Sequence, residues 1–283
     1  QDMEMHLIRR DFGQARALGG LGGGFDVWAP PAASEPRSGG FDVVGDEFSQ
    51  VLEIQVRPGE VVTAEPGTML YTSDGISLGA DIGGLEQGLK RCCCAGESMF
   101  RLHLENRRAS ASVEDVGLAT GGVEKVALTP SFPAKIVPID LRQHNGLIFN
   151  RGAFLAALGK SWRVDIKMVN GGCTCCFAGQ GLFMNTLHGD GMVFLNAGGT
   201  VMTKHLQPDE RIVVDHHAVL AFERTVSMSI RQTGGCMVCC CAGQGLFNTE
   251  LSGPGFVMVH SMSLSKLRSS VAPKDKSKAG GAA

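Results

Sequence analysis

The sequence has no long hydrophobic run and few aromatic residues. A membrane-spanning helix needs about 20 consecutive apolar residues, and the chain has no stretch of about 18 or more. Aromatic residues make up 6% of the 283 residues, whereas glycine occurs 39 times. Short strands joined by tight turns fit this composition better than long helices. We therefore expect an all-β protein that is soluble or bound peripherally to a membrane.

The sequence also lacks an excess of either charge. It contains 26 Lys and Arg residues against 28 Asp and Glu residues, which gives a formal net charge of −2. This balance provides no long-range attraction toward nucleic-acid phosphates or an anionic membrane. The single tyrosine leaves few side chains for base stacking. On this basis we expect no nucleic-acid partner.

Apolar residues recur at every second position in several segments, which is typical of strands with one buried face. The clearest examples are Leu52, Ile54 and Val56, then Val164, Ile166 and Met168, and then Val226, Met228 and Ile230. Residues 192–195 and 256–259 are apolar on both faces, as in a strand that lies between two sheets. This pattern predicts a β-sandwich or a closed barrel.

One motif occurs three times, at residues 93–100, 176–183 and 240–247. The first spacing is longer than the second, so we place an insertion within residues 107–138. The repeat predicts three tandem strand-rich units, at about 41–125, 126–200 and 201–268, which share one core around a pseudo-threefold axis.

The two ends of the chain lack a periodic apolar pattern. Residues 1–40 are rich in Gly and Pro, and we expect a mobile arm there. Residues 269–283 combine lysines with small residues, and we expect a disordered tail. The chain begins at Gln1 and shows no targeting segment, although one could lie upstream.

The ten cysteines occur in three runs, one at the start of each motif copy. Vicinal cysteines do not suit disulfide geometry, so a reducing compartment is favoured. The cysteines could be small buried hydrophobes, ligands of zinc or copper or redox-active thiols, or acylation sites beside Lys90 and Arg91. Cys236 and Cys239 give a CxxC half-site, and a second clean half-site is missing. The candidate metal ligands are Cys92, Cys93, Cys94, Cys173, Cys175, Cys176, Cys236, Cys239, Cys240 and Cys241.

No other residue pattern indicates catalysis. His216 and His217 are expected on a strand, where neighbours face opposite sides and cannot form one ligand pair. No spacing brings two of the carboxylates Asp140, Asp215 and Glu223 together for acid and base catalysis, so we interpret them as strand-end polar residues. We expect no enzyme, no catalytic residue and no cofactor.

Several segments resemble a known family in the same order along the chain. The similarity covers about residues 41–265, and the segments that carry it are 64–71, 89–91, 96–98, 133–141, 152–156, 181–183, 189–191, 245–247 and 253–255. On these segments the chain resembles the altered-inheritance-of-mitochondria twenty-four family. The cysteine runs depart from the family pattern, which has glycine, serine or other small residues at these turns.

The resemblance implies a fold similar to the tryptophan RNA-binding attenuator protein, with tandem units in a pseudo-threefold assembly. It also implies a mitochondrial, non-enzymatic scaffold or assembly factor. Its protein partners would be inner-membrane and respiratory complexes, with peripheral membrane contact. The alternatives are a metal- or redox-responsive protein that uses the cysteine runs, an RNA-binding module, and a cytoplasmic location.

Elemental analysis of protein purified without chelator tests the cysteine interpretations. If the cysteines are buried hydrophobes, the protein will carry less than about one tenth of an equivalent of any transition metal. Near-stoichiometric zinc or copper, or a reactive thiol of low pKa, would contradict this interpretation.

Overall fold

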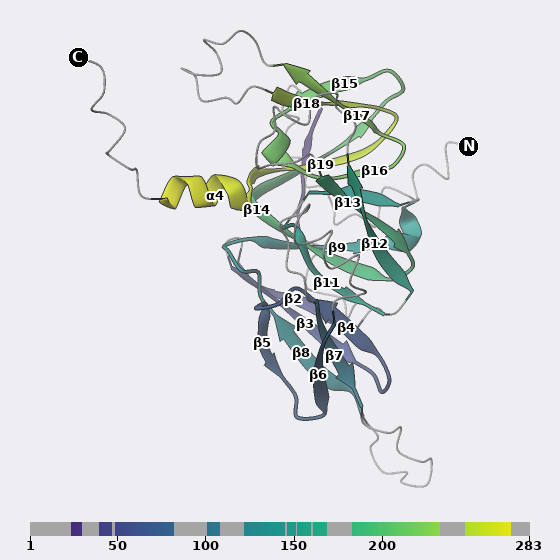
Figure 1. The fold of residues 1–283 in the computed structure, drawn as a ribbon, viewed down its shortest axis with the longest axis vertical. Coiled ribbons are helices and arrows are strands. Elements are labelled where there is room, and N and C mark those ends of the chain that lie inside the picture. Colours follow the sequence, from purple (N-terminus) through teal and green to yellow (C-terminus); the bar gives the residue numbers. More distant parts are fainter. Residues whose placement is uncertain are drawn as a thin grey trace, which may run out of the picture.

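The computed structural model describes residues 24–29, 40–46, 49–81, 101–107, 122–144, 146–150, 152–159, 161–168, 183–232 and 247–272. Antiparallel strands form most of this part, and its one α-helix is α4 (Leu264–Val271) (Figure 1). The all-β prediction is confirmed. None of the described sheets closes on itself, so the predicted closed barrel is wrong for this part of the chain. Across the same residues no helix is long and apolar enough to traverse a bilayer.

The N-terminal part of the chain forms a four-stranded sheet and one flank of a larger sheet. The order of the four-stranded sheet is β2-β3-β8-β5. The strands are β1 (Asp26–Val27), β2 (Phe41–Gly45), β3 (Gln50–Val56), β4 (Val61–Ala64), β5 (Met69–Thr72), β6 (Ile76–Asp81), β7 (Arg101–Asn106) and β8 (Glu124–Leu128).

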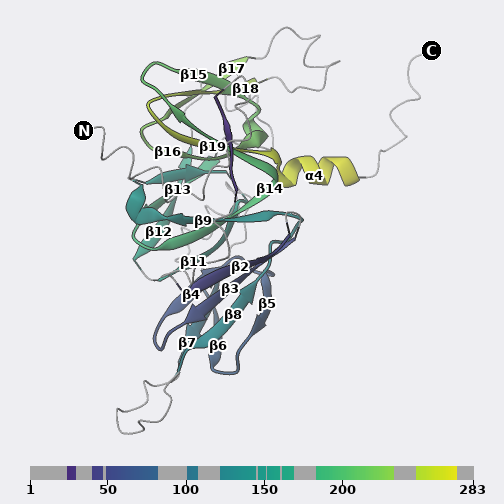
Figure 2. The same ribbon diagram turned by 180° about the vertical axis from the view of Figure 1, so that it is seen from behind.

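The rest of the chain completes the larger sheet and adds a three-stranded sheet at the other end of the molecule (Figures 1 and 2). The remaining strands are β9 (Lys135–Asp140), β10 (Leu147–Phe149), β11 (Phe154–Leu158), β12 (Trp162–Met168), β13 (Phe183–Gly189), β14 (Met192–Leu206), β15 (Arg211–Val214), β16 (Val219–Glu223), β17 (Ser227–Gln232), β18 (Phe247–Ser252) and β19 (Gly255–Met262). The larger sheet runs β12-β13-β10-β16-β19-β14-β11-β4-β7-β6, and the small sheet runs β15-β18-β17.

One pairing scheme occurs three times along the chain. First, β8 lies between β3 and β5, and β7 lies between β4 and β6. Next, the first half of β14 lies between β9 and β11, and β13 lies between β10 and β12. Finally, β19 lies between the second half of β14 and β16, and β18 lies between β15 and β17. The long strand β14 therefore takes part in two successive schemes.

Equivalent turns in the first and third schemes have the same local construction. Residues 57–60 read Arg-Pro-Gly-Glu and residues 207–210 read Gln-Pro-Asp-Glu. In each turn the Glu carboxylate accepts a hydrogen bond from the first residue's N–H at 2.9 Å. The third residue has positive φ, 78° at Gly59 and 63° at Asp209, a region that glycine and aspartate tolerate better than bulky residues. The similar turns lead each chain segment into an equivalent strand, β4 or β15.

Buried apolar side chains form three clusters rather than one shared interior. The predicted common core is therefore wrong for the described residues. Phe194 of β14 belongs to the cluster built mainly from the first scheme, where its ring meets Phe41 edge to face at 4.9 Å. A side chain from a strand of the second pairing scheme thus completes the core built by the strands of the first, and this contact connects the two groups of strands.

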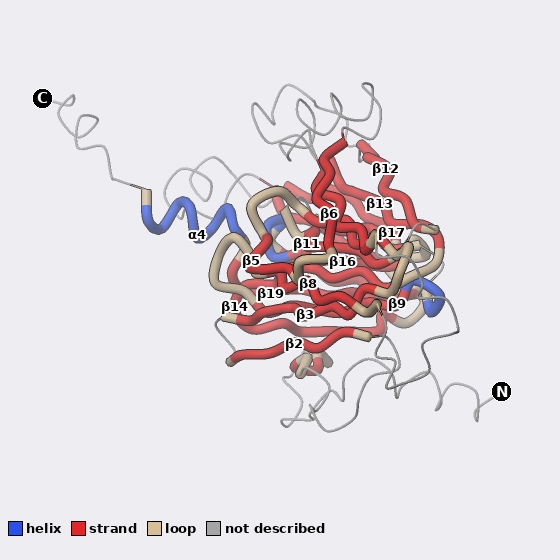
Figure 3. Tube along the Cα trace, turned by 90° about the horizontal axis from the view of Figure 1, so that it is seen from below, coloured by secondary structure: helices blue, strands red, loops and turns tan. Residues whose placement is uncertain are grey.

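Of the predicted arm and tail, only residues 24–29, 40 and 269–272 lie within the described residues. Within the predicted N-terminal arm, β1 pairs with β14, and Trp28 is only 3% exposed in the middle cluster. The helix α4 includes the first residues of the predicted tail, and Ser263 caps it by accepting from the Lys266 N–H. Figure 3 shows α4 projecting away from the sheets. The connection from β7 to β8 is longer than its equivalents and lies within the predicted insertion.

We predict that Phe194→Ala lowers the free energy of unfolding by about 3–5 kcal/mol, because it opens a cavity in a fully buried contact between two schemes. Leu78→Ala is the control, since Leu78 is 52% exposed, and it should change stability by less than about 0.5 kcal/mol. Denaturant unfolding measures both variants. Equal stability losses in the two variants would contradict the assigned packing.

Candidate functional site

The three cysteine runs lie outside the described residues, so their candidate ligands have no assigned positions. The structure does describe the strands on either side of each run. These strands pair as β6 with β7, β12 with β13, and β17 with β18. Every cysteine run therefore falls in the segment that joins two paired antiparallel strands, and the three strand pairs occupy equivalent positions in the three pairing schemes. Within the described ranges, no group of three or more His, Cys, Asp or Glu side chains could hold a metal ion.

His216 and His217 lie in a 3-10 turn, η4 (His216–Ala218), and not on a strand as predicted. Asp215 caps the turn, and its carboxylate accepts from the His217 N–H at 2.9 Å. The imidazole Nδ1 of His216 lies 3.3 Å from the Thr249 hydroxyl. Nδ1 of His217 lies 3.0 Å from the hydroxyl of Ser265 on α4. The two rings therefore have separate partners and hold η4 against β18 and α4.

His260 lies beneath this turn and is only 5% exposed. Its Nε2 donates to the His217 carbonyl at 3.2 Å, while its buried Nδ1 has no hydrogen-bond partner among the described residues. Burial lowers the pKa of His260 to about 4, and the positive charge of Lys266 acts in the same direction. The imidazole is therefore neutral near pH 7, and protonation would place an uncompensated charge in the core.

The three carboxylates that we considered for acid and base catalysis take part in local structure. Asp140 caps the 3-10 turn η2 (Leu141–Gln143) and pairs with Arg142, whose hydrogen bonds lower the pKa of the Asp140 carboxyl. Glu223 bonds to Nδ1 of His144 and to the Phe256 N–H, both at 2.9 Å, and the His144 bond contributes most to lowering its pKa. Asp215 caps η4. Each group therefore has a structural role at the end of a strand or turn.

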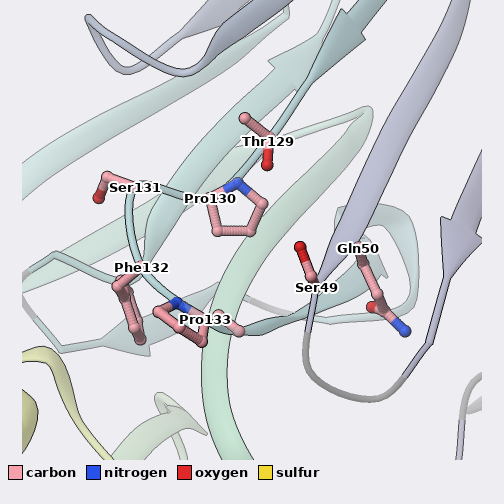
Figure 4. Close-up of a pocket in the computed structure, with 8 residues that line it drawn as sticks. Ser49, Gln50, Thr129, Pro130, Ser131, Phe132 and Pro133 are labelled. Atoms are coloured by element: carbon pink, nitrogen blue, oxygen red, sulfur yellow. The ribbon is translucent and has the colours of Figure 1, made fainter.

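A small groove lies between the start of β3 and the segment that joins β8 to β9 (Figure 4). Its volume is about 260 Å³, below the roughly 300–1,000 Å³ of most ligand pockets. Gln50 lines the groove, and the Gln50 side-chain oxygen accepts a hydrogen bond from the Ile136 N–H at 2.7 Å. The polar groups of the groove thus include one already used to position β9, and we assign no ligand to it.

Strand edges at the two ends of the molecule are the strongest candidate for a functional surface. β5 ends the four-stranded sheet, and three consecutive large side chains on it are exposed: Met69 by 41%, Leu70 by 53% and Tyr71 by 42%. The Tyr71 hydroxyl donates to the Glu53 carboxylate, so only its ring adds to the apolar surface. β15 ends the three-stranded sheet and exposes Val213 by 45%. An uncovered strand edge offers main-chain donors and acceptors to another strand, and apolar side chains strengthen such contacts.

Sequence reasoning did not identify this surface. The segment around Leu70 contributed to the family resemblance, but its sequence resembles that of equivalent buried segments elsewhere in the chain. The only available signal was the absence of polar alternation at residues 69–71, and a fully buried strand produces the same signal.

Replacement of His260 by Gln tests the buried imidazole. Gln can keep the hydrogen bond to the His217 carbonyl but does not titrate. Because the folded pKa of about 4 lies below the ordinary 6.5, the wild type loses stability as pH falls from about 6.5 to 4, by up to about 3 kcal/mol. Urea unfolding at several pH values should show a shallower acid loss for His260→Gln. Parallel pH profiles for both proteins would contradict the assignment.

Comparison with known proteins identifies the family. The profile of the family described as Mitochondrial biogenesis AIM24 matches residues 41–262. An uncharacterised protein of Streptococcus pyogenes serotype M6 is 28% identical over 222 residues, which cover 76% of this chain and 82% of that protein. A crystal structure of a Streptococcus pyogenes protein has a TM-score of 0.62 and 25% identity, and the match covers 81% of this chain and 96% of that one.

These matches confirm the family resemblance read from the sequence. They extend over most of the described body and include the strands of all three pairing schemes. Both streptococcal relatives are bacterial, so they do not establish a mitochondrial location for this chain. The chain belongs to the Mitochondrial biogenesis AIM24 family.

Proposed function

We propose that this chain is a non-enzymatic scaffold or assembly factor that acts on protein partners at the mitochondrial inner membrane and supports the respiratory complexes. Family membership supports a role in mitochondrial biogenesis. The observation that carries the proposal is the exposed apolar edge of β5, formed by Met69, Leu70 and Tyr71. An exposed strand edge of this kind suits binding to another polypeptide strand.

The scaffold in this proposal consists of three tandem units. The repeated pairing scheme supports this division. A register shift that occurs at the equivalent position of all three units supports it further. The register shifts between Met69 and Tyr71 in β5, between Phe154 and Ala156 in β11, and between Val219 and Ala221 in β16. β-bulges are positioned features of a fold rather than random defects. We therefore treat β5, β11 and β16 as one strand type, and β4, β10 and β15 as another.

A rigid array of sheets is suited to hold partners in a fixed arrangement. The units are joined by continuous strand pairing, with β4 against β11 and β10 against β16. Their cores contain side chains from adjacent units. Surfaces on different units therefore keep a constant separation, as a scaffold requires. In this proposal no residue has a catalytic role.

Cells that lack this protein provide the test. Deletion should reduce assembled respiratory complexes, and the complete reading frame should restore them and fractionate with mitochondria. Leu70→Lys should fail to restore the complexes, because a charge on β5 blocks strand binding. Leu78→Lys is the matched control, since Leu78 is 52% exposed on β6 and Leu70 is 53% exposed.

If the complete protein fractionates outside mitochondria and deletion leaves the respiratory complexes unchanged, the proposed role is wrong. If Leu70→Lys restores the complexes as well as Leu78→Lys does, the β5 edge is not the working surface. Both substitutions are at exposed positions, so each should change folding stability by less than about 0.5 kcal/mol.

A further inference from the structure

Neighbouring units are connected by strand pairing at two places in the chain, and we call each of these pairings a joint. The two joints have the same construction. β11 of the second unit pairs antiparallel with β4 of the first, and β16 of the third unit pairs antiparallel with β10 of the second. In the first joint Ala156 lies opposite Ala64, and in the second Ala221 lies opposite Phe149. Each of these pairs contains the residue that directly follows the register shift, Ala156 or Ala221. The two joints therefore share one register.

Hydrogen bonds beyond the paired residues are also equivalent. The Glu65 N–H donates to the Leu155 carbonyl at 3.0 Å, and the Asn150 N–H donates to the Leu220 carbonyl at 2.9 Å. At the other end of the joints, the Gly159 N–H donates to the Val61 carbonyl at 3.1 Å, and the Arg224 N–H donates to the Gly146 carbonyl at 3.4 Å. Each joint therefore uses the same backbone groups.

A leucine crosses each joint into the neighbouring core. Leu155 of the second unit belongs to the cluster of the first unit, and Leu220 of the third unit belongs to the cluster of the second. Both leucines are 0% exposed. Leu70 is their equivalent in the first unit, and it is 53% exposed. The cluster of the third unit, in turn, leaves Ile212 and Val214 of β15 only partly buried.

Within the described residues, one half of the joint thus stays unpaired at each end of the body. In the described part of the chain, β5 pairs only with β8, and β15 pairs only with β18. The two strands lie at opposite ends of the long axis of the molecule (Figures 1 and 2). A single chain therefore cannot bring its own β5 and β15 together in this structure.

We propose that β15 of one copy pairs antiparallel with β5 of a second copy and forms the joint a third time. The register of the two internal joints places Val214 opposite Tyr71 of the second copy, Val213 opposite Thr72, and Ile212 opposite Ser73. Leu70 of the second copy enters the cluster of the third unit and covers Ile212 and Val214. The Asp215 N–H donates to the Leu70 carbonyl of the second copy.

A second copy is the occupant that the chain itself specifies. The two strand types already pair twice within one chain, and the free edges are one strand of each type. An unrelated partner strand would have to reproduce the same register and the same inserted leucine. Because the contact joins two different surfaces, it is heterologous, so copies join head to tail into a ring or an open chain. The proposed function takes the β5 edge as the working surface, and this inference deepens it by naming the partner.

Sedimentation velocity of the purified complete chain over a range of concentrations tests the contact. The wild type should form species larger than one chain. Leu70→Lys removes the inserted leucine, and Val213→Lys places a charge within the paired strand, so each variant alone should be monomeric. In the Val213→Lys variant the introduced ammonium group can face Glu250, the cross-strand neighbour of Val213 on β18, which keeps the variant fold acceptable. Leu78→Lys should assemble like the wild type.

Mixing the two variants gives the sharpest result. Leu70→Lys retains a working β15, and Val213→Lys retains a working β5, so an equal mixture can form one contact and no more. The mixture should therefore give a species of two chains and nothing larger. Circular dichroism and thermal unfolding are used to check that both variants are folded.

Several results would overturn the inference. A wild type that is monomeric at every concentration would do so, even if a different protein binds β5 in cells. Assembly by either folded single variant, or a mixture that stays monomeric or grows beyond two chains, would also overturn it. These measurements use purified protein, whereas the cellular role is tested by deletion and fractionation, so failure of one is distinguishable from failure of the other.

Discussion

The joint between units is the contact on which the rest of the structure depends. Isolated units of this length would bury little apolar surface, and each has a core that is open on one side. A leucine from the next unit covers that open side, at Leu155 for the first core and at Leu220 for the second. Strand pairing across the joint fixes the register at the same time. The three clusters therefore replace the single shared core that the repeat suggested.

Sequence periodicity predicted the individual strands well. Leu52, Ile54 and Val56 alternate with polar residues, and all three are 0% exposed in β3. The triplicated motif predicted equivalent strand-rich units, and the strands on either side of each cysteine run do pair in the same manner. These features follow from local rules, because strand alternation and turn chemistry depend on a few neighbouring residues.

Features that depend on distant contacts were not predictable. β1 is too short for a periodic pattern, and its position depends on pairing with β14 and on the burial of the following Trp28. The turn η4 lies between two apolar strands, so the sequence pattern there reads as a strand, although Asp215 is an ordinary capping residue. The open ends are the clearest case. Leu70, Leu155 and Leu220 are the same residue type at equivalent positions, so composition cannot tell the exposed leucine from the two buried ones.

The central claim is that one joint, formed twice within the chain, is formed a third time between chains. Amide hydrogen exchange of the Asp215 and Asp74 N–H groups tests it most directly. Asp215 is the equivalent of Glu65 and Asn150, and Asp74 is the equivalent of Gly159 and Arg224, so both N–H groups would become donors across the third joint. These amides should become protected as protein concentration rises, and Leu70→Lys should abolish the protection. Exchange rates that are independent of concentration and identical in the variant would contradict the account.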